Sequence, residues 1–234
     1  MVPPSAAFPI EIRCQGILFD MDGILISSLE AVERCWLQWA ALHGVDRDLT
    51  LRTLHGRRAI ETVAILRPDL DPQRELEFME DLECADTEGL KVLPGVVDLL
   101  RALPAHRWTV VTSATARLAR VRLAAAGLPA PKRIVTAELV RNGKPHPEPF
   151  LAGAEQLGFR PEDCVVFEDS ASGAQAGRAA GCTVVATTFS HEAASLEAAH
   201  YVIADITGVA AQTRSDGLLL RLRPASSASL TPAT

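Results

Sequence analysis

The chain has 234 residues, of which 48% are hydrophobic and 22% are charged, so it can bury a sizeable core. Its 23 basic and 29 acidic side chains give a net charge of −6, which argues against a nucleic-acid-binding face. No run of about 18 apolar residues could span a membrane, and the first residues lack the pattern of a secretory signal. We therefore expect a cytoplasmic protein without nucleic-acid or membrane partners, and a monomer or a weak dimer.

Six short, apolar, β-branched segments are typical of strands buried on both faces of a parallel sheet. They lie at 16–19, 108–112, 133–135, 164–167, 183–186 and 201–203. Helical stretches are expected between them at 95–103, 116–126, 147–157 and 171–180. This alternation predicts an α/β fold with a doubly wound (Rossmann-like) parallel sheet.

The alternation is interrupted between the first and second strands. Residues 28–90 contain no convincing strand, and helices are expected at 29–43, 59–66 and 73–88. We interpret 28–90 as an inserted, all-helical cap domain with hinges at 26–28 and 89–94. Residues 1–27 and 91–223 would then form the core, and the Ser-, Ala-, Pro- and Thr-rich segment 224–234 a disordered tail.

Polar side chains follow four of the predicted strands, at the sheet edge where ligands bind in doubly wound folds. Four of them are carboxylates, one is a lysine, and the others carry hydroxyl groups. These residues are Asp20, Asp22, Thr112, Ser113, Thr115, Lys144, Glu168, Asp169 and Ser170.

The chemistry of this set indicates a cation and a phosphoryl group. Several carboxylates in one small volume repel each other unless a cation neutralises them, and an all-oxygen set favours Mg²⁺. A cation, Lys144 and several hydroxyls suit a phosphoryl group, whose transition state spreads negative charge over its oxygens. The helix expected from Ala116 would direct its first N–H groups to the same place. Asp20 and Asp22 together can supply a nucleophile and a proton donor.

Four motifs occur in a fixed order: FDMDG at 19–23, VTSA at 111–114, GKP at 143–145 and FEDSASG at 167–173. Together they resemble the motifs of the haloacid dehalogenase superfamily, and the helical block after the first motif resembles its phosphoglucomutase-like branch. The segments 32–36, 55–57, 87–89 and 127–131 are similar to those of bacterial sugar phosphatases, also called hexitol phosphatases.

The resemblance implies a role for each motif residue. Asp20 would attack phosphorus and form an aspartyl-phosphate intermediate. Asp22 would protonate the departing oxygen and later take a proton from the hydrolytic water. The implied phosphate-binding residues are Ser113, Ala114 and Lys144. The implied Mg²⁺ ligands are Asp20, Asp22 through its carbonyl, and Asp169, with Glu168 close by or acting through water.

Two positions in the cap are candidate substrate contacts. His55 and Arg57 would face the substrate, or would instead begin a helix. Trp36 and Trp39 are in helical phase with apolar neighbours, which favours a place in the cap core.

The expected function is Mg²⁺-dependent hydrolysis of phosphomonoesters, with small phosphorylated sugars or sugar alcohols as substrates. Three alternatives stay open: a sugar phosphomutase of the β-phosphoglucomutase kind, a glycerol-phosphate phosphatase, and a non-catalytic phosphosugar-binding protein.

Overall fold

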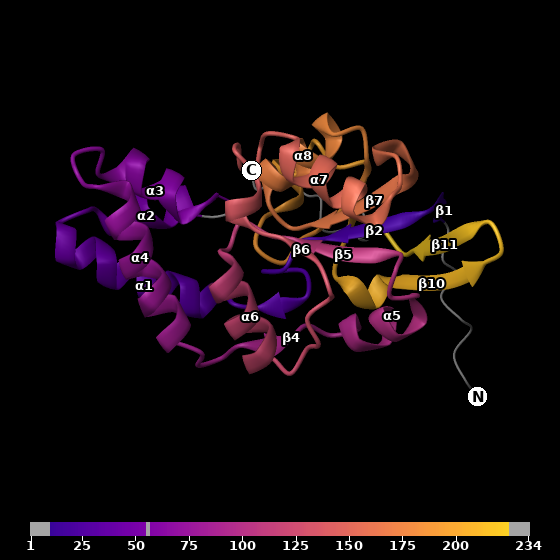
Figure 1. The fold of residues 1–234 in the computed structure, drawn as a ribbon, viewed down its shortest axis with the longest axis horizontal. Helices are drawn as coiled ribbons and strands as arrows, with labels where there is room; N and C mark the ends of the chain where they lie inside the picture. The colour runs from indigo at the N-terminus through magenta and orange to yellow at the C-terminus, as the bar shows by residue number, and fades with distance from the viewer. Residues whose placement is uncertain (1–9, 55–56, 225–234) are drawn as a thin grey trace, which may run out of the picture.

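The computed structural model describes residues 10–54 and 57–224 (Figure 1). Its centre is a six-stranded parallel sheet of order β6-β5-β2-β7-β8-β9. All six predicted strands are present, so the doubly wound α/β fold is confirmed. Their bounds are β2 (Gly16–Phe19), β5 (Trp108–Val111), β6 (Ile134–Val135), β7 (Cys164–Glu168), β8 (Thr183–Thr187) and β9 (Tyr201–Ile203).

Helices cover both faces of this sheet because alternate side chains of each strand point to opposite sides. In β2, Phe19 packs with residues of α5 and α6, whereas Leu18 packs with residues of α7 and α8. Figure 1 shows these two helix pairs on opposite faces of the sheet. The helices are α5 (Val96–Ala102), α6 (Ala116–Ala125), α7 (Glu148–Leu157) and α8 (Ala171–Ala179).

The helix predicted at 116–126 is present as α6, which ends one residue earlier, at Ala125. The hydroxyl of Thr115 accepts a hydrogen bond from the Leu118 N–H, which caps the first turn. Gly127 follows the last turn with φ of 72°, a backbone conformation that favours glycine.

A second, antiparallel sheet was missed in the sequence. It has the order β1-β11-β10 and joins the beginning of the described chain to its end. The strand β10 carries two alanines and a glutamine where a clear strand signal needs β-branched or aromatic residues. The bounds are β1 (Ile10–Cys14), β10 (Val209–Arg214) and β11 (Gly217–Leu222).

Residues 29–85, which lie between β2 and α5, contain four helices among the described residues, and we call this segment the helical insertion. Three were predicted; the second was missed because it is polar and short. The last helix ends at residue 85, not 88, because the backbone adopts an extended conformation at Asp86. The Asp86 side chain forms an ion pair with Arg34. The bounds are α1 (Leu29–His43), α2 (Arg47–Leu54), α3 (Ala59–Leu66) and α4 (Pro72–Ala85).

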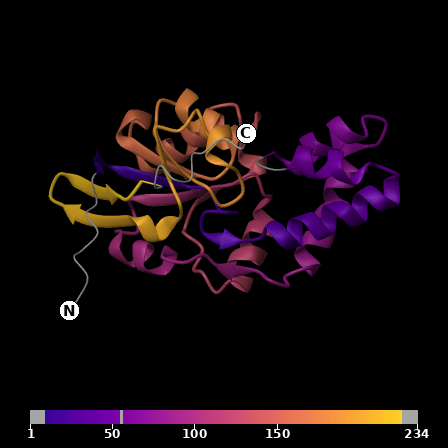
Figure 2. The same ribbon diagram turned by 180° about the vertical axis from the view of Figure 1, so that it is seen from behind.

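The helical insertion has its own apolar core, in which Trp39 is completely buried and Trp36 nearly so, as expected for the cap core. Two short strands, β3 (Ile26–Ser27) and β4 (Lys91–Val92), connect it to the sheet and pair with each other. Seen from either side, the helical insertion and the β10–β11 hairpin lie at opposite ends of the molecule (Figures 1 and 2).

The division into a core (1–27 and 91–223) and a cap (28–90) stays a prediction. Apart from residue 224, the expected tail lies outside the described residues. In the described part of the chain, no helix is both long and apolar enough to cross a bilayer.

Candidate active site

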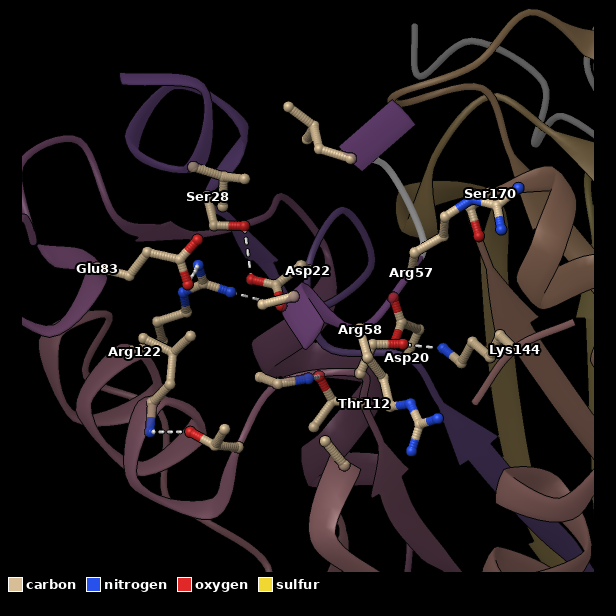
Figure 3. Close-up of a pocket in the computed structure, with 18 of the residues that line it drawn as sticks. Asp20, Asp22, Ser28, Arg57, Arg58, Glu83, Thr112, Arg122, Lys144 and Ser170 are labelled. Carbon is tan, nitrogen blue, oxygen red and sulfur yellow. Dashed lines mark hydrogen bonds and ion pairs between the residues drawn. The ribbon is translucent and has the colours of Figure 1, made fainter. Parts of the chain in front are cut away.

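A cavity of about 340 Å³ lies between the carboxyl ends of the parallel strands and the helical insertion (Figure 3). The core contributes Asp20 and Asp22 after β2, Ser113 after β5 and Asp169 after β7. Residues of α1, α3 and α4 line the opposite wall. The sheet thus brings together motif residues that are far apart in sequence.

Lys144 forms the centre of a buried ionic cluster. Its Nζ lies 2.7 Å from Asp20 Oδ1 and 2.6 Å from Glu168 Oε1, and it also donates to the Val111 carbonyl at 3.2 Å. All three side chains of the cluster are buried. Burial disfavours the ammonium, but the two carboxylates outweigh this effect and hold the pKa of Lys144 above its ordinary value.

Glu168 is held by the loop that follows its own strand. Its Oε2 accepts hydrogen bonds from the backbone N–H groups of Asp169 and Ser170 and from the Ser170 hydroxyl, at 2.7–2.9 Å. Burial alone would raise the pKa of Glu168, but Lys144 and Ser170 hold it below its ordinary value. Gly173 makes room for this side chain, since a Cβ there would lie 1.7 Å from Glu168 Oε1.

The acidic residues fit a divalent cation. Asp20, Glu168 and Asp169 each offer an oxygen within 4.8 Å of the others. Burial raises the pKa of Asp20 to about 7 and that of Asp169 well above its ordinary value. Three buried carboxylates face one lysine, so a hard cation would balance the remaining negative charge. Gly23, with φ of 80°, lets the first motif lie close to Asp169, because a Cβ at this position would be 1.8 Å from Asp169 Oδ2.

Asp22 lies on the side of the cavity that faces the helical insertion. Its Oδ1 accepts a 2.5 Å hydrogen bond from the Ser28 hydroxyl, and its Oδ2 lies 2.9 Å from Arg122 Nη1 (Figure 3). Arg122 also donates through Nη2 to Glu83 Oε2 at 3.3 Å.

Ser28, Glu83 and Arg122 were not among the site residues predicted from the sequence. A signal was nonetheless present, because Arg122 shares its helix face with the buried Leu118, four positions earlier. In the same way, Glu83 follows the buried Met79 by four positions in α4. A charged residue within an apolar helix stripe indicates a buried ionic partner.

The proposed phosphate-binding positions also line the cavity. Ser113 and Ala114 lie there beside Lys144, in the turn between β5 and α6. The N–H of Ala114 donates to the Thr112 hydroxyl, and the N–H of Ala116 donates to Glu138 at 2.8 Å. The first N–H of α6 is therefore engaged within the protein and is not free for a phosphate, contrary to expectation.

Of the two candidate substrate contacts in the cap, Arg57 is exposed and lines the cavity, and His55 lies outside the described residues. The neighbouring Arg58 pairs with Glu61 and contacts the core through the Val140 carbonyl at 3.4 Å. Trp36, although buried, also lines the cavity.

Comparison with known proteins gives consistent results. Residues 14–181 match the family model described as haloacid dehalogenase-like hydrolase. Hexitol phosphatase A of Escherichia coli (strain K12) is 44% identical over 179 residues, covering 74% of this chain and 83% of that protein. Glycerol-1-phosphate phosphohydrolase 2 of Saccharomyces cerevisiae is 34% identical over 195 residues, covering 77% and 78%. A solved structure described as a putative β-phosphoglucomutase from Bacteroides vulgatus superposes with a TM-score of 0.69 at 26% identity, covering 83% and 85%.

Proposed function

Because the chain belongs to the haloacid dehalogenase-like hydrolases, we propose that it hydrolyses phosphomonoesters of small sugars or sugar alcohols. The observation that carries this proposal is the buried pair of Asp20 and Lys144 beside two further carboxylates, at the floor of a cavity. A carboxylate nucleophile next to a fixed cation is suited to attack on an anionic phosphoryl group.

In the first step, Asp20 forms a bond to phosphorus while the ester P–O bond breaks, and Asp22 gives a proton to the departing sugar oxygen. In the second step, water attacks the aspartyl phosphate, loses its proton to Asp22 and regenerates Asp20. Phosphate is the second product, so atoms and charges balance over the cycle.

Lys144 and Ser113 are proposed to hold the phosphoryl oxygens in both steps. The Ala114 N–H would join them by exchanging its hydrogen bond to the Thr112 hydroxyl for one to the phosphoryl group. Asp20, the Asp22 carbonyl and Asp169 would hold Mg²⁺, which supplies positive charge against the phosphoryl oxygens when bound. Glu168 already accepts four hydrogen bonds from the protein. We therefore propose that Glu168 orients Lys144 and the loop after β7. Any contact between Glu168 and the metal would be made through water.

Residues 28–90 are proposed to act as a cap that covers the substrate and excludes water. The cavity beneath them is at the lower end of the size range of small-molecule sites, which suits a small substrate. The named activities of two relatives, on hexitol and glycerol phosphates, make polyol phosphates the first substrates to try.

A sugar phosphomutase is the second candidate, because the putative β-phosphoglucomutase from Bacteroides vulgatus shares the fold. Such an enzyme would keep its phosphorylated intermediate bound and return the phosphoryl group to the sugar. A binding protein without activity is not favoured, since Asp20, Asp22, Lys144 and Asp169 all line one cavity.

The test is phosphate release from hexitol, hexose and glycerol phosphates, with Mg²⁺ and then with excess EDTA. Magnesium-dependent release that is absent in Asp20→Asn is the expected result. Conversion of β-glucose 1-phosphate to the 6-phosphate with little release would instead identify a mutase. If the protein shows neither hydrolysis nor isomerisation of any ester, the proposal is contradicted and the binding protein is favoured.

A further inference from the structure

Arg122 connects the proposed proton donor to the helical insertion. It comes from α6 in the core, and its guanidinium contacts Asp22 after β2 at 2.9 Å and Glu83 in α4 at 3.3 Å. The three residues therefore belong to three segments that are widely separated in sequence. Figure 3 shows Arg122 between the two carboxylates.

The surroundings of Arg122 make this arrangement rigid. Arg122 is 5% exposed and Glu83 is 7% exposed. A buried charge without a partner is costly, so separating the guanidinium from Glu83 would carry a large penalty. Its planar fork offers a separate donor to each carboxylate, Nη1 to Asp22 and Nη2 to Glu83.

Asp22 is fixed from two sides. The Ser28 hydroxyl occupies Oδ1 and Arg122 occupies Oδ2, so rotation of the carboxyl group would break at least one of these hydrogen bonds. Asp22 nevertheless lines the cavity. Its carboxyl group is thus presented to the substrate in one orientation.

We infer that Arg122 is a positioning residue that sets the orientation of Asp22, and that Glu83 holds Arg122 in place from the helical insertion. This inference rests on the proposed role of Asp22 as proton donor. The seating of α4 on α6 then contributes directly to the placement of the proton donor.

A matched control lies on the same helix. Arg117 of α6 also pairs with α4, at 3.1 Å from Glu80 and 2.6 Å from Asp81, but it is exposed and does not line the cavity. Arg117→Met removes contacts between the core and the helical insertion without touching Asp22. Arg122→Met removes such a contact and the partner of Asp22 together.

The test compares two esters in single-turnover experiments. Glycerol 1-phosphate has an alkoxide leaving group that needs a proton, whereas p-nitrophenyl phosphate releases a stable phenolate that does not. We expect Arg122→Met to slow transfer from the glycerol ester about 50-fold, as for a misplaced catalytic group. Transfer from the aryl ester should fall less than about threefold, and Arg117→Met should change both less than about threefold.

In an Asp22→Asn background, Arg122→Met should slow the glycerol ester no further. Equal slowing of both esters by Arg122→Met would overturn the inference, because it would indicate a general structural role. Selective slowing of the glycerol ester in Arg117→Met would overturn the inference as well.

A second measurement does not depend on activity. Unfolding by denaturant in EDTA is compared for Asp22→Asn, Arg122→Met and the double variant. Residues in contact should give effects that are non-additive by about tenfold in the unfolding equilibrium constant, and additive effects would overturn the inference. If the wild-type protein hydrolyses no ester, the proposed function fails, and this cycle still tests the contact.

Discussion

Lys144 Nζ lies 2.7 Å from Asp20 Oδ1, although the two residues are 124 positions apart in the chain. Lys144 is 2% exposed and also contacts Glu168, so its single positive charge is shared between two buried carboxylates. This relationship connects stability to the proposed chemistry, because the charge that would hold a phosphoryl group also keeps the acidic cluster folded.

Lys144→Met should therefore destabilise the protein as well as abolish turnover. Removing one partner of a buried ionic cluster costs about 3 kcal/mol of unfolding free energy, since the remaining carboxylates stay unpaired. Saturating Mg²⁺ should recover part of this loss, because the cation binds the same carboxylates. Denaturant unfolding with EDTA and with Mg²⁺ measures both effects. Unchanged stability in EDTA would contradict the assigned role of Lys144.

Gly173→Ala should displace Glu168. The new Cβ would lie 1.7 Å from Glu168 Oε1, and the carboxylate cannot move without losing Lys144 and the loop N–H groups. We expect a loss of about 2 kcal/mol in unfolding free energy, as for other overpacked sites, and a large fall in turnover. Gln175→Ala on the exposed face of the same helix is the control. Wild-type turnover in Gly173→Ala would show that the Glu168 position is not needed.

Arg57→Ala should change substrate preference and not the chemistry. Arg57 is exposed at the cavity wall, so it could donate a charge-assisted hydrogen bond to a sugar hydroxyl. Losing such a bond should raise KM for a hexitol phosphate about tenfold, while p-nitrophenyl phosphate hydrolysis stays within about twofold. Steady-state kinetics on both substrates measures the difference. Equal losses on both would indicate that Arg57 acts structurally.

Glu83 should make stability depend on pH. Burial raises the pKa of Glu83 above its ordinary value of 4.5, and this effect exceeds the opposing effect of Arg122. A raised pKa in the folded state means that the contribution to stability is full below pH 4.5 and is lost as the pH rises through the folded value.

The unfolding free energy of the wild type should therefore fall relative to Glu83→Gln as the pH rises from 4.5, the ordinary pKa. Denaturant unfolding from about pH 4 to pH 8 in EDTA measures the gap between the two proteins. A gap that is constant or that changes in the opposite direction would contradict the raised pKa of Glu83.

Local patterns carried most of the fold prediction. The six buried strands and the helices between them each have a signal within their own residues, and the motif residues follow directly from the strand ends. The strand β10 and the helix α2 lack such a signal, because Ala and Gln favour no strand and the α2 stripe is short.

The site was predictable where one strand end supplies the whole motif, as for Asp20 and Asp22. The Arg122–Glu83 contact was not, because it depends on how α4 packs against α6, which no local pattern specifies. For the same reason, no local pattern specifies that Arg57 of the helical insertion lines the same cavity as Asp20.

The pairing of β3 with β4 has a consequence for how such a protein can diversify. Ile26 lies opposite Val92, so the chain leaves the core and returns to it at adjacent points. A module with neighbouring ends can be exchanged for another of different length, or grafted onto a related core, without displacing a strand of the parallel sheet. New substrate ranges can then evolve by replacing this module while Asp20 and Lys144 stay where they are.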